Sequence, residues 1–158
     1  MTNNWSKFGD RFARPTGASE LMEDLGLAAA LKNDGSSIYY VHNRFRDDRE
    51  MVLLAVQTAG SVIHYTSFTN DEEVCLEALK NNGKSYFYLH AEQKAKKHVL
   101  LAAIKNYPHI ISNIDESWKF DEEICYEACR RQFYLIHRIF VDFKYNLNFI
   151  KKVVENYI

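Results

Sequence analysis

Apolar residues recur along this chain in blocks spaced about 25 residues apart. A small or aliphatic residue stands at the centre of each block: Ala30, Ala55, Ala78, Ala103, Ala128 and Val153, separated by steps of 25, 23, 25, 25 and 25 residues. In most blocks, apolar residues also stand four and three positions before this anchor and one position after it, and such positions share one stripe of an α-helix. The pattern predicts amphipathic first helices near 22–33, 48–58, 71–81, 96–106, 121–131 and 146–157.

A second, shorter apolar pattern follows each of the first five helices. It consists of pairs three residues apart: Ile38 and Val41, Ile63 and Thr66, Tyr86 and Leu89, Ile111 and Ile114, Ile136 and Ile139. These pairs predict second helices near 36–44, 61–68, 84–94, 109–118 and 133–143. A unit of this size cannot bury its own apolar stripe, whereas stacked units can. The sequence therefore predicts an all-α fold, a short α-solenoid of about five helix–turn–helix repeats plus a C-terminal helix.

Polar and special residues mark the ends of the predicted first helices. Seven positions before the anchors stand Glu23, Asp48, Asp71, Lys96, Asp121 and Asn146. An acidic or Asn side chain can accept hydrogen bonds from the free amides of a first helical turn. Lys96 cannot, so we expect the fourth helix to begin less firmly. Gly35, Gly60 and Gly83, and then Pro108, stand five positions after the anchors, where Gly is typical of a left-handed helix stop.

The repeats suggest how the chain is divided. Residues 22–158 are predicted to form one helical-repeat domain, and residues 1–21 an N-terminal leader or cap. Trp5, Phe8 and Phe12 are apolar enough that we expect them to cover the exposed stripe of the first unit. In the fifth unit Phe133 replaces the Gly, and the apolar segment that follows fits an end cap packed against the last helix.

The repeated unit, DDREMVLLAVQTAGSVIHYTSF in its second copy, resembles the repeat family known as domain of unknown function 4116. The shared features are an acidic start, an Ala-Val pair, a Gly and a Tyr. The fourth and fifth units depart from the pattern, because Asn113 and Arg138 stand where the Tyr is expected. The resemblance covers residues 22–158. It implies a helical-repeat fold and no established activity.

Residues 5–26 look like the opening of valine–pyruvate type aminotransferases, which use pyridoxal phosphate. The matching positions are Phe8, Gly9, Asp10, Phe12, Gly17, Leu21, Met22, Asp24 and Leu25. The Gly-rich loop that follows in those enzymes is missing, and the rest of this chain cannot supply the large fold that holds the cofactor. The resemblance therefore implies no aminotransferase activity. A coincidence or a gene-fusion remnant is preferred over mimicry that docks the chain on such an enzyme.

Charge and hydropathy restrict the function classes. The formal net charge is −1, which does not favour broad electrostatic binding of nucleic acid. Residues 1–79 have a formal charge of −5 and residues 80–158 of +4, which could favour head-to-tail contacts between molecules. No apolar run approaches the roughly 20 residues of a membrane span. The start lacks a secretory signal pattern and the three cysteines suit a reducing compartment, so we expect a cytoplasmic location, with secretion by another kind of signal left open.

The residues with catalytic or metal-binding chemistry form no familiar motif. Cys125 and Cys129 have a spacing that could hold two metal ligands. Cys75 shares the column of Cys125, however, and the column is otherwise aliphatic, so buried thiols are preferred. A nucleophile set of Cys129, His137 and Asp142, as in a small cysteine-dependent enzyme, is the minor alternative. We expect no catalytic residues, no metal and no cofactor.

Two polar or aromatic columns are candidates for binding a partner. The tyrosines Tyr40, Tyr65 and Tyr88 stand at one phase of successive units, and the asparagines Asn33, Asn81 and Asn106 recur in the last turn of the first helices. Packing between units is the preferred interpretation of the Tyr column, and an exposed protein-binding face is the alternative. Helix-end capping is preferred for the Asn column over a peptide clamp. The sequence favours a non-catalytic protein-interaction module of unknown partner, with head-to-tail self-assembly as the alternative.

Overall fold

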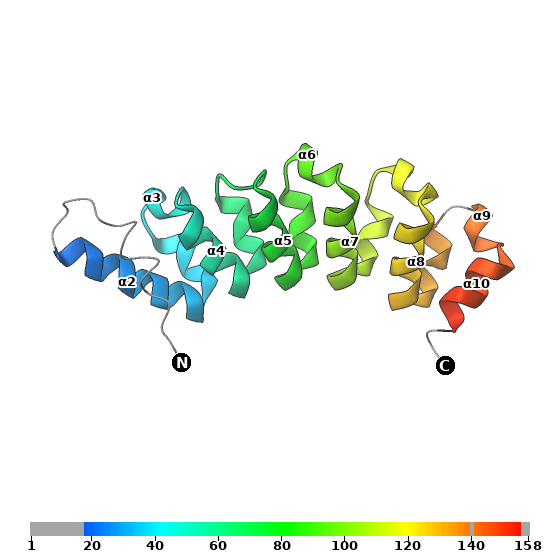
Figure 1. Cartoon of the computed structure of the whole chain (residues 1–158), viewed down its shortest axis with the longest axis horizontal. Coiled ribbons are helices and arrows are strands. Elements are labelled where there is room, and N and C mark those ends of the chain that lie inside the picture. The colour runs from blue at the N-terminus through cyan, green and yellow to red at the C-terminus, as the bar shows by residue number, and fades with distance from the viewer. Residues whose placement is uncertain (1–17, 140, 156–158) are drawn as a thin grey trace.

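The stacked units form an elongated rod with the first and last helices at opposite ends (Figure 1). The computed structural model describes residues 18–139 and 141–155, with side chains from residue 24 onward except at 140–142. Within these residues all regular elements are helical, so the predicted all-α solenoid is confirmed. No helix in that part of the chain is long and apolar enough to cross a membrane. Trp5, Phe8 and Phe12 lie outside the described residues, and the predicted leader stays a prediction.

The first helices of the six units lie side by side in one row. They are α2 (Ala18–Asn33), α4 (Arg49–Thr58), α5 (Glu72–Asn81), α7 (Lys97–Asn106), α8 (Glu122–Arg131) and α10 (Leu147–Val154). Each unit is numbered by its first helix in this order. α2 begins before the predicted start, so Glu23 lies inside the helix and the expectation that it belongs to a first turn is wrong.

Acidic or Asn residues begin four of the other five first helices, as the sequence predicted. The Oδ1 atom of Asp48 accepts hydrogen bonds from the backbone N–H groups of Glu50 at 2.9 Å and Met51 at 3.1 Å. Asp71, Asp121 and Asn146 cap their helices in the same way. Lys96 makes no side-chain cap, which confirms the expectation for the fourth helix.

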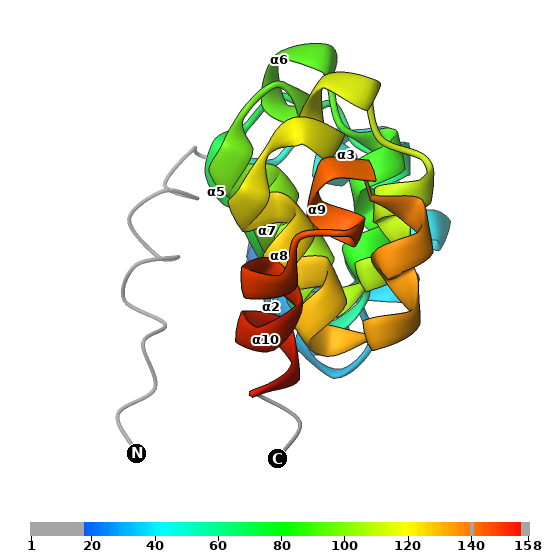
Figure 2. The ribbon, with the colours of Figure 1, turned by 90° about the vertical axis from the view of Figure 1, so that its right-hand side faces the viewer.

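The second row consists of 3₁₀-helices rather than α-helices. They are η1 (Gly35–Tyr40), η2 (Gly60–Tyr65), η3 (Gly83–Tyr88), η4 (Pro108–Ser112) and η6 (Phe133–Arg138). Seen along the rod, this row lies to the right of the first-helix row in Figure 2. A 3₁₀-helix has three residues per turn, so side chains three apart lie over one another. Only the first member of each apolar pair lies within its 3₁₀-helix, whereas the second lies just past the end, as Val41 does after η1 and Thr66 after η2.

A short third element returns the chain to the next first helix in four units. These elements are α3 (Asn43–Arg46), α6 (Ala91–Lys94), η5 (Glu116–Phe120) and α9 (Val141–Lys144). The prediction of one continuous second helix, such as 84–94, is therefore wrong. The second unit has a simple turn between Tyr65 and Asp71 instead, which accounts for its 23-residue step.

Basic side chains in two third elements bind the carboxyl ends of the 3₁₀-helices. Arg46 donates to the carbonyl oxygens of Ile38 at 3.2 Å and Tyr39 at 2.6 Å. At the same position of the third unit, the Nζ atom of Lys94 donates to the carbonyl oxygen of Phe87 at 2.8 Å. A positive charge is favourable beside the last carbonyl groups of a helix. These contacts fix the third elements on the second row.

The hydrophobic core runs without interruption between the two rows. Fully buried side chains from the first helices include Leu31, Val52, Leu79, Leu100, Ile104 and Ile124, and those from the second row include Ile38, Ile63, Ile110 and Ile111. Every inner unit therefore contributes apolar side chains to two junctions. This is how repeats that are individually too small become stable.

Candidate functional site

Glycines allow the units to approach one another closely. A Cβ atom on Gly60 would lie 2.3 Å from the carbonyl oxygen of Ala78, the anchor of the next unit. A Cβ atom on Gly35 would lie 2.0 Å from the carbonyl oxygen of Ala55, and one on Gly83 would lie 2.5 Å from that of Ala103. Ala55 and Ala103 are likewise the anchors of the next units. No glycine among the described residues has a positive φ. The expectation of a left-handed helix stop is therefore wrong, because these positions require a missing Cβ rather than a special backbone angle.

The Asn column binds the backbone of the preceding unit at each of these close contacts. Asn81 accepts a hydrogen bond at Oδ1 from the N–H of Gly60 at 2.8 Å, and its Nδ2 donates to the carbonyl oxygen of Gln57 at 3.1 Å. Asn106 accepts from the N–H of Gly83 at 3.0 Å and donates to the carbonyl oxygen of Lys80 at 3.0 Å. We call this two-bond contact the inter-unit clamp.

Thr58 forms the inter-unit clamp with its hydroxyl group in the second unit. Its Oγ1 atom accepts from the N–H of Gly35 at 2.8 Å and lies 3.1 Å from the carbonyl oxygen of Leu31, to which it can donate. The preferred interpretation of the column as capping thus extends across unit boundaries. Since Asn81 and Asn106 use both ends of their amide groups within the chain, a binding surface is better sought elsewhere.

Two members of this column, Arg131 and Asn33, form no inter-unit clamp. Pro108 has no N–H to donate, and the column residue facing it is Arg131, which pairs instead with Glu127 of its own helix at 2.9 Å. Asn33 belongs to the first unit, so no preceding unit stands beside it in the described part of the chain, where its side chain makes no hydrogen bond. Among the described units, the inter-unit clamp therefore forms only where a preceding unit offers a backbone N–H.

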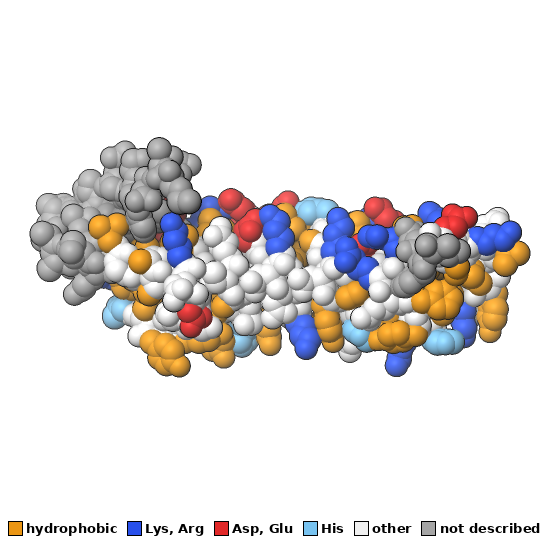
Figure 3. Space-filling model, turned by 90° about the horizontal axis from the view of Figure 1, so that it is seen from below, with side chains coloured by type: hydrophobic (Ala, Val, Ile, Leu, Met, Phe, Trp, Pro, Cys, Tyr) orange, Lys and Arg blue, Asp and Glu red, His pale blue; other side chains and the backbone are white. Residues whose placement is uncertain are grey.

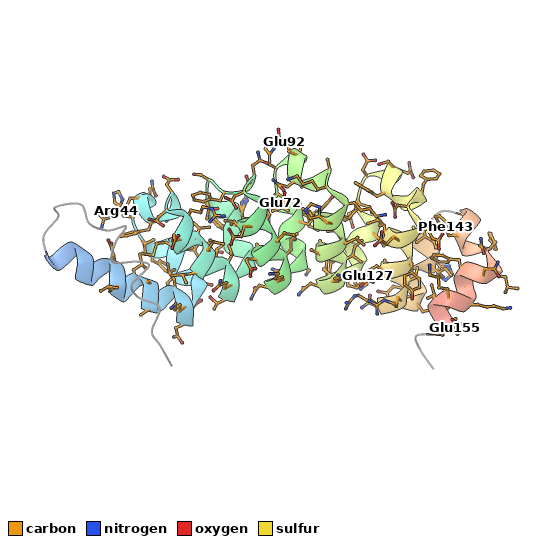
Figure 4. The ribbon with its side chains drawn as sticks, viewed as in Figure 1. Arg44, Glu72, Glu92, Glu127, Phe143 and Glu155 are labelled. Atoms are coloured by element: carbon orange, nitrogen blue, oxygen red, sulfur yellow. The ribbon has the colours of Figure 1, made fainter. Side chains whose placement is uncertain are left out.

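Ion pairs link the amino-terminal ends of neighbouring first helices. Arg49, the first residue of α4, pairs with Asp71 at 2.7 Å and with Glu73 at 2.5 Å. Glu72, the first residue of α5, pairs with Lys96 and with the ring of His98 at 3.0 Å. Figure 4 shows Glu72 at the upper end of α5, where the helices begin.

The next two junctions between units continue this ion-pair series. At each one, the charge of the first residue of the earlier helix is opposite to that at the junction before. Lys97 pairs with Asp121 and Glu123, both at 2.8 Å, and Glu122 pairs with Lys152 at 3.1 Å. The first residue of each helix therefore alternates between base and acid from the second unit to the fifth. Lys96 stands where other units have an acidic cap because it faces Glu72.

These ion pairs adjust the ionisation of the carboxyl groups without adding much stability. The hydrogen bond from Arg49 holds the pKa of Asp71 below its usual range. Exposed pairs of this kind contribute on the order of 1 kcal/mol or less each. Their main effect is to select which unit can stack on which.

The cysteines belong to the core, as the sequence indicated. Burial raises the pKa of the thiols of Cys75 and Cys129 to about 12. The Sγ atom of Cys75 lies 3.3 Å from the carbonyl oxygen of Thr69, and that of Cys125 lies 3.2 Å from the carbonyl oxygen of Lys119. A thiol at this column can thus donate a weak hydrogen bond to the turn before the helix, which an aliphatic side chain cannot.

The other chemical hypotheses gain no support from the described geometry. His137 lies on the surface whereas Cys129 is fully buried, and the side chain of Asp142 lies outside the described residues. No group of three His, Cys, Asp or Glu side chains is arranged to hold a metal ion among the residues that the structure describes.

We expect all three cysteines to resist iodoacetamide in the folded protein at pH 8. With a pKa of about 12 the thiols of Cys75 and Cys129 stay protonated, only the thiolate reacts, and Cys125 is buried from the reagent. In urea all three should be labelled rapidly, as mass spectrometry would show. Fast, selective labelling of Cys129 in the folded protein would instead support the cysteine-dependent enzyme.

Exposed aromatic rings follow one another along the second row. We define the aromatic row by its residues: Tyr39, Tyr40, His64, Tyr65, Phe87, Tyr88, His109 and Tyr134. The exposed fractions of the three candidate tyrosines are 91% for Tyr40, 53% for Tyr65 and 44% for Tyr88. Figure 3 shows hydrophobic and His side chains with several Lys or Arg side chains along the lower edge, which is the second row, while acidic and basic side chains gather together along the upper edge.

Rings of adjacent units contact one another within the aromatic row. Tyr39 meets Tyr65 edge to face with ring centroids 4.7 Å apart, and His64 lies 4.5 Å from Tyr88. Further along, the rings of His109 and Tyr134 are 5.5 Å apart. Tyr65 and Tyr88 thus contact a ring of the preceding unit and still present much of their surface to solvent, whereas Tyr40 is 91% exposed.

A groove of about 480 Å³ lies beside the aromatic row, between α6 and η5. Phe87, Lys94, Asp115 and Trp118 are among its lining residues. Asp115 is committed to capping η5, where its carboxylate accepts from the N–H of Ser117 at 2.9 Å. Burial raises the pKa of Tyr86, which also lines the groove, to about 12, so its hydroxyl stays protonated.

Comparisons with known proteins identify one family and give no relative of known activity. No curated protein matches the chain, and no solved structure matches it. The aminotransferase resemblance falls largely on residues outside the described part, and the family match begins at residue 28. That match covers residues 28–69, 60–93 and 97–144, thus most of the repeat units. The chain belongs to the family described as domain of unknown function (DUF4116).

Proposed function

We propose that this chain is a non-catalytic protein-interaction module that binds another polypeptide along its aromatic row. The observation that carries the proposal is the set of exposed rings at the same position of three successive units, Tyr40, Tyr65 and Tyr88. Tyr offers a large, amphipathic contact area with few rotatable bonds and is enriched among residues that dominate binding energy. Exposed apolar side chains gathered on one face favour a binding surface over ordinary surface composition.

The backbone that carries the row is well suited to binding without rearrangement. Each 3₁₀-helix from η1 to η3 begins at a glycine held by the inter-unit clamp. Contacts between rings of neighbouring units further restrict the side chains. Tyr65 and Tyr88 are therefore already held in place when a partner binds, which reduces the entropy lost on binding.

The proposal is tested by changing Tyr40, Tyr65 and Tyr88 together to Ser. Removing three exposed rings should reduce capture of a specific partner from host lysate at least about tenfold, because tenfold corresponds to only about 1.4 kcal/mol. Capture is measured by quantitative mass spectrometry, and circular dichroism checks that the helices remain. A matched variant with Gln57, Lys105 and Lys151 changed to Ser alters exposed residues of the first-helix row and should capture the partner as the wild type does.

Two outcomes would contradict the proposal. Equal capture by the wild type and the folded Tyr variant would remove the aromatic row from the binding surface. Capture of the chain by itself alone, with a light-scattering mass that rises with concentration and falls with salt, would favour head-to-tail self-assembly through the oppositely charged halves, since salt screens exposed charges.

A further inference from the structure

The second row differs from the rest of the surface because it contains no acidic residue. The helices η1, η2, η3, η4 and η6 include no Asp or Glu, although the whole chain has 21. The same five helices contain the basic or titratable residues Lys84, Arg138, His64, His109 and His137. Two acidic residues adjoin them, Asp34 before η1 and Asp115 in the groove beside η3, and their carboxylates already accept the N–H groups of Ser36 and Ser117, both at 2.9 Å.

The two permanent cations of the second row are not neutralised within the described part of the chain. There, no carboxylate lies within ion-pair distance of Lys84 or Arg138. Lys84 instead places its Nζ atom 5.1 Å from the ring centre of Tyr107. The first-helix row behaves in the opposite way, since each base of the ion-pair series meets an acid of the next unit. In the second row, Lys84 and Arg138 thus lie among exposed rings without a carboxylate partner in the described part of the chain.

We infer that the aromatic row binds an extended, acidic segment of another polypeptide. Carboxylates of the segment would meet Lys84 and Arg138, which lie on η3 and η6, and its apolar side chains would pack on the exposed tyrosines of η1 to η3. Complementary charge speeds association and disfavours wrong partners. This inference rests on the proposed function and adds the charge of the partner.

A single-stranded nucleic acid is the other ligand that combines stacking with negative charge. It fits less well, because binding several phosphates requires a corresponding number of Lys or Arg side chains. The five helices of the second row supply only Lys84 and Arg138. An acidic polypeptide can space its carboxylates widely and place apolar residues between them. The observed surface therefore favours the polypeptide.

The groove between α6 and η5 is not needed for this inference. It brings Lys94 and Asp115 to one place, so its charge is mixed, and Lys94 already donates to the backbone of Phe87. The argument for an acidic ligand depends on the helices of the second row, which contain Lys84 and Arg138 but no Asp or Glu.

The inference is tested with fluorescein-labelled peptides of equal length, built from Glu-Pro-Phe, Gln-Pro-Phe or Lys-Pro-Phe repeats, and with labelled oligouridylate. Fluorescence anisotropy should show the Glu peptide binding at least about tenfold more tightly than the Gln peptide and weakening with added salt. Changing Lys84 and Arg138 together to Gln should remove that preference. The matched variant with Lys105 and Lys151 changed to Gln should keep it.

Each other outcome has a defined meaning. If the Gln and Glu peptides bind equally and both are lost in the Tyr40, Tyr65 and Tyr88 variant, the acidic preference is wrong while the proposed function stands. Tighter binding of oligouridylate than of the Glu peptide would replace the polypeptide by a nucleic acid. Failure of the Glu peptide to bind would also overturn the inference, and the proposed function would then be judged by the lysate capture alone.

Discussion

Changing Gly60 to Ala should lower the free energy of unfolding by about 3 kcal/mol, the upper part of the range for overpacked sites. The new Cβ atom would stand 2.3 Å from the carbonyl oxygen of Ala78 and 3.1 Å from the backbone nitrogen of Asn82. Both neighbours are backbone atoms, so no side chain can rotate away. The second and third units would have to separate, and the hydrogen bond from Gly60 to Asn81 would lengthen. Urea unfolding followed by circular dichroism measures the change.

Gly26 provides a matched control for this substitution. It lies inside α2, and a Cβ atom there would meet nothing within 4 Å. Replacing a helical Gly by Ala usually stabilises by about 0.5–1 kcal/mol, so Gly26→Ala should unfold at equal or higher urea concentration than the wild type. A Gly60→Ala variant as stable as the wild type would show that the close approach of the units is not required.

Changing Asn81 to Ala should cost about 1–3 kcal/mol, the usual penalty for leaving a buried polar group without a partner. The N–H of Gly60 would lose its acceptor at 2.8 Å and the carbonyl oxygen of Gln57 its donor at 3.1 Å. The Asp variant should fall between Ala and the wild type, because it keeps an acceptor for Gly60 and loses the donor. Urea unfolding compares the three proteins.

Asn33 tests whether this cost arises from the inter-unit clamp. It occupies the same column, and in the described part of the chain its side chain makes no hydrogen bond. Asn33→Ala should therefore remain within about 0.5 kcal/mol of the wild type, as surface substitutions usually do. Equal losses for Asn33→Ala and Asn81→Ala would mean that the column acts through its own helix and not through the preceding unit.

The helical rows could be predicted from sequence because their signal is local and repeated. The anchor spacing located α4, α5, α7 and α8 to within about two residues. The type of the second helix was missed, because pairs such as Ile38 and Val41 were assigned to one helix, whereas Val41 lies in extended backbone just past the end of η1. One turn of α-helix and one turn of 3₁₀-helix bury similar pairs of apolar side chains. Spacing alone did not decide between them over so short a segment.

The roles of Gly60 and Asn81 were not predictable by local rules, because their partners lie in the next or preceding unit. A Gly after a helix usually indicates a left-handed residue, whereas here it permits contact with a carbonyl group 18 positions along the chain, at Ala78. A usable signal did exist in the sequence. Pro108 and Arg131 depart from the Gly and Asn columns at the same junction, and this joint change is expected if the two columns are hydrogen-bonded.

The exposure of the tyrosines could be foreseen only in part. One Tyr stands at the same position in each of three successive units. This predicts that Tyr40, Tyr65 and Tyr88 share a face, and each of them is the last residue of its 3₁₀-helix. How far each ring is covered depends on the offset between adjacent units and on the neighbouring ring, such as His64 against Tyr88. Those quantities follow from the packing of the whole rod, so packing and exposure looked like alternatives although both occur.

The alternating ion pairs limit how such a rod can change its length. If the third unit were deleted, Arg49 would face Lys96 and His98, and like charges would oppose the new junction. If the third and fourth units were deleted together, Arg49 would face Asp121 and Glu123 and find partners equivalent to Asp71 and Glu73. The third and fourth units can therefore be gained or lost without electrostatic conflict as a pair, 50 residues from Asp71 to Asp121, but the third cannot be lost alone. A history of duplication in pairs would explain why DEEVCLEALKNNG and DEEICYEACRRQF are more alike than adjacent units.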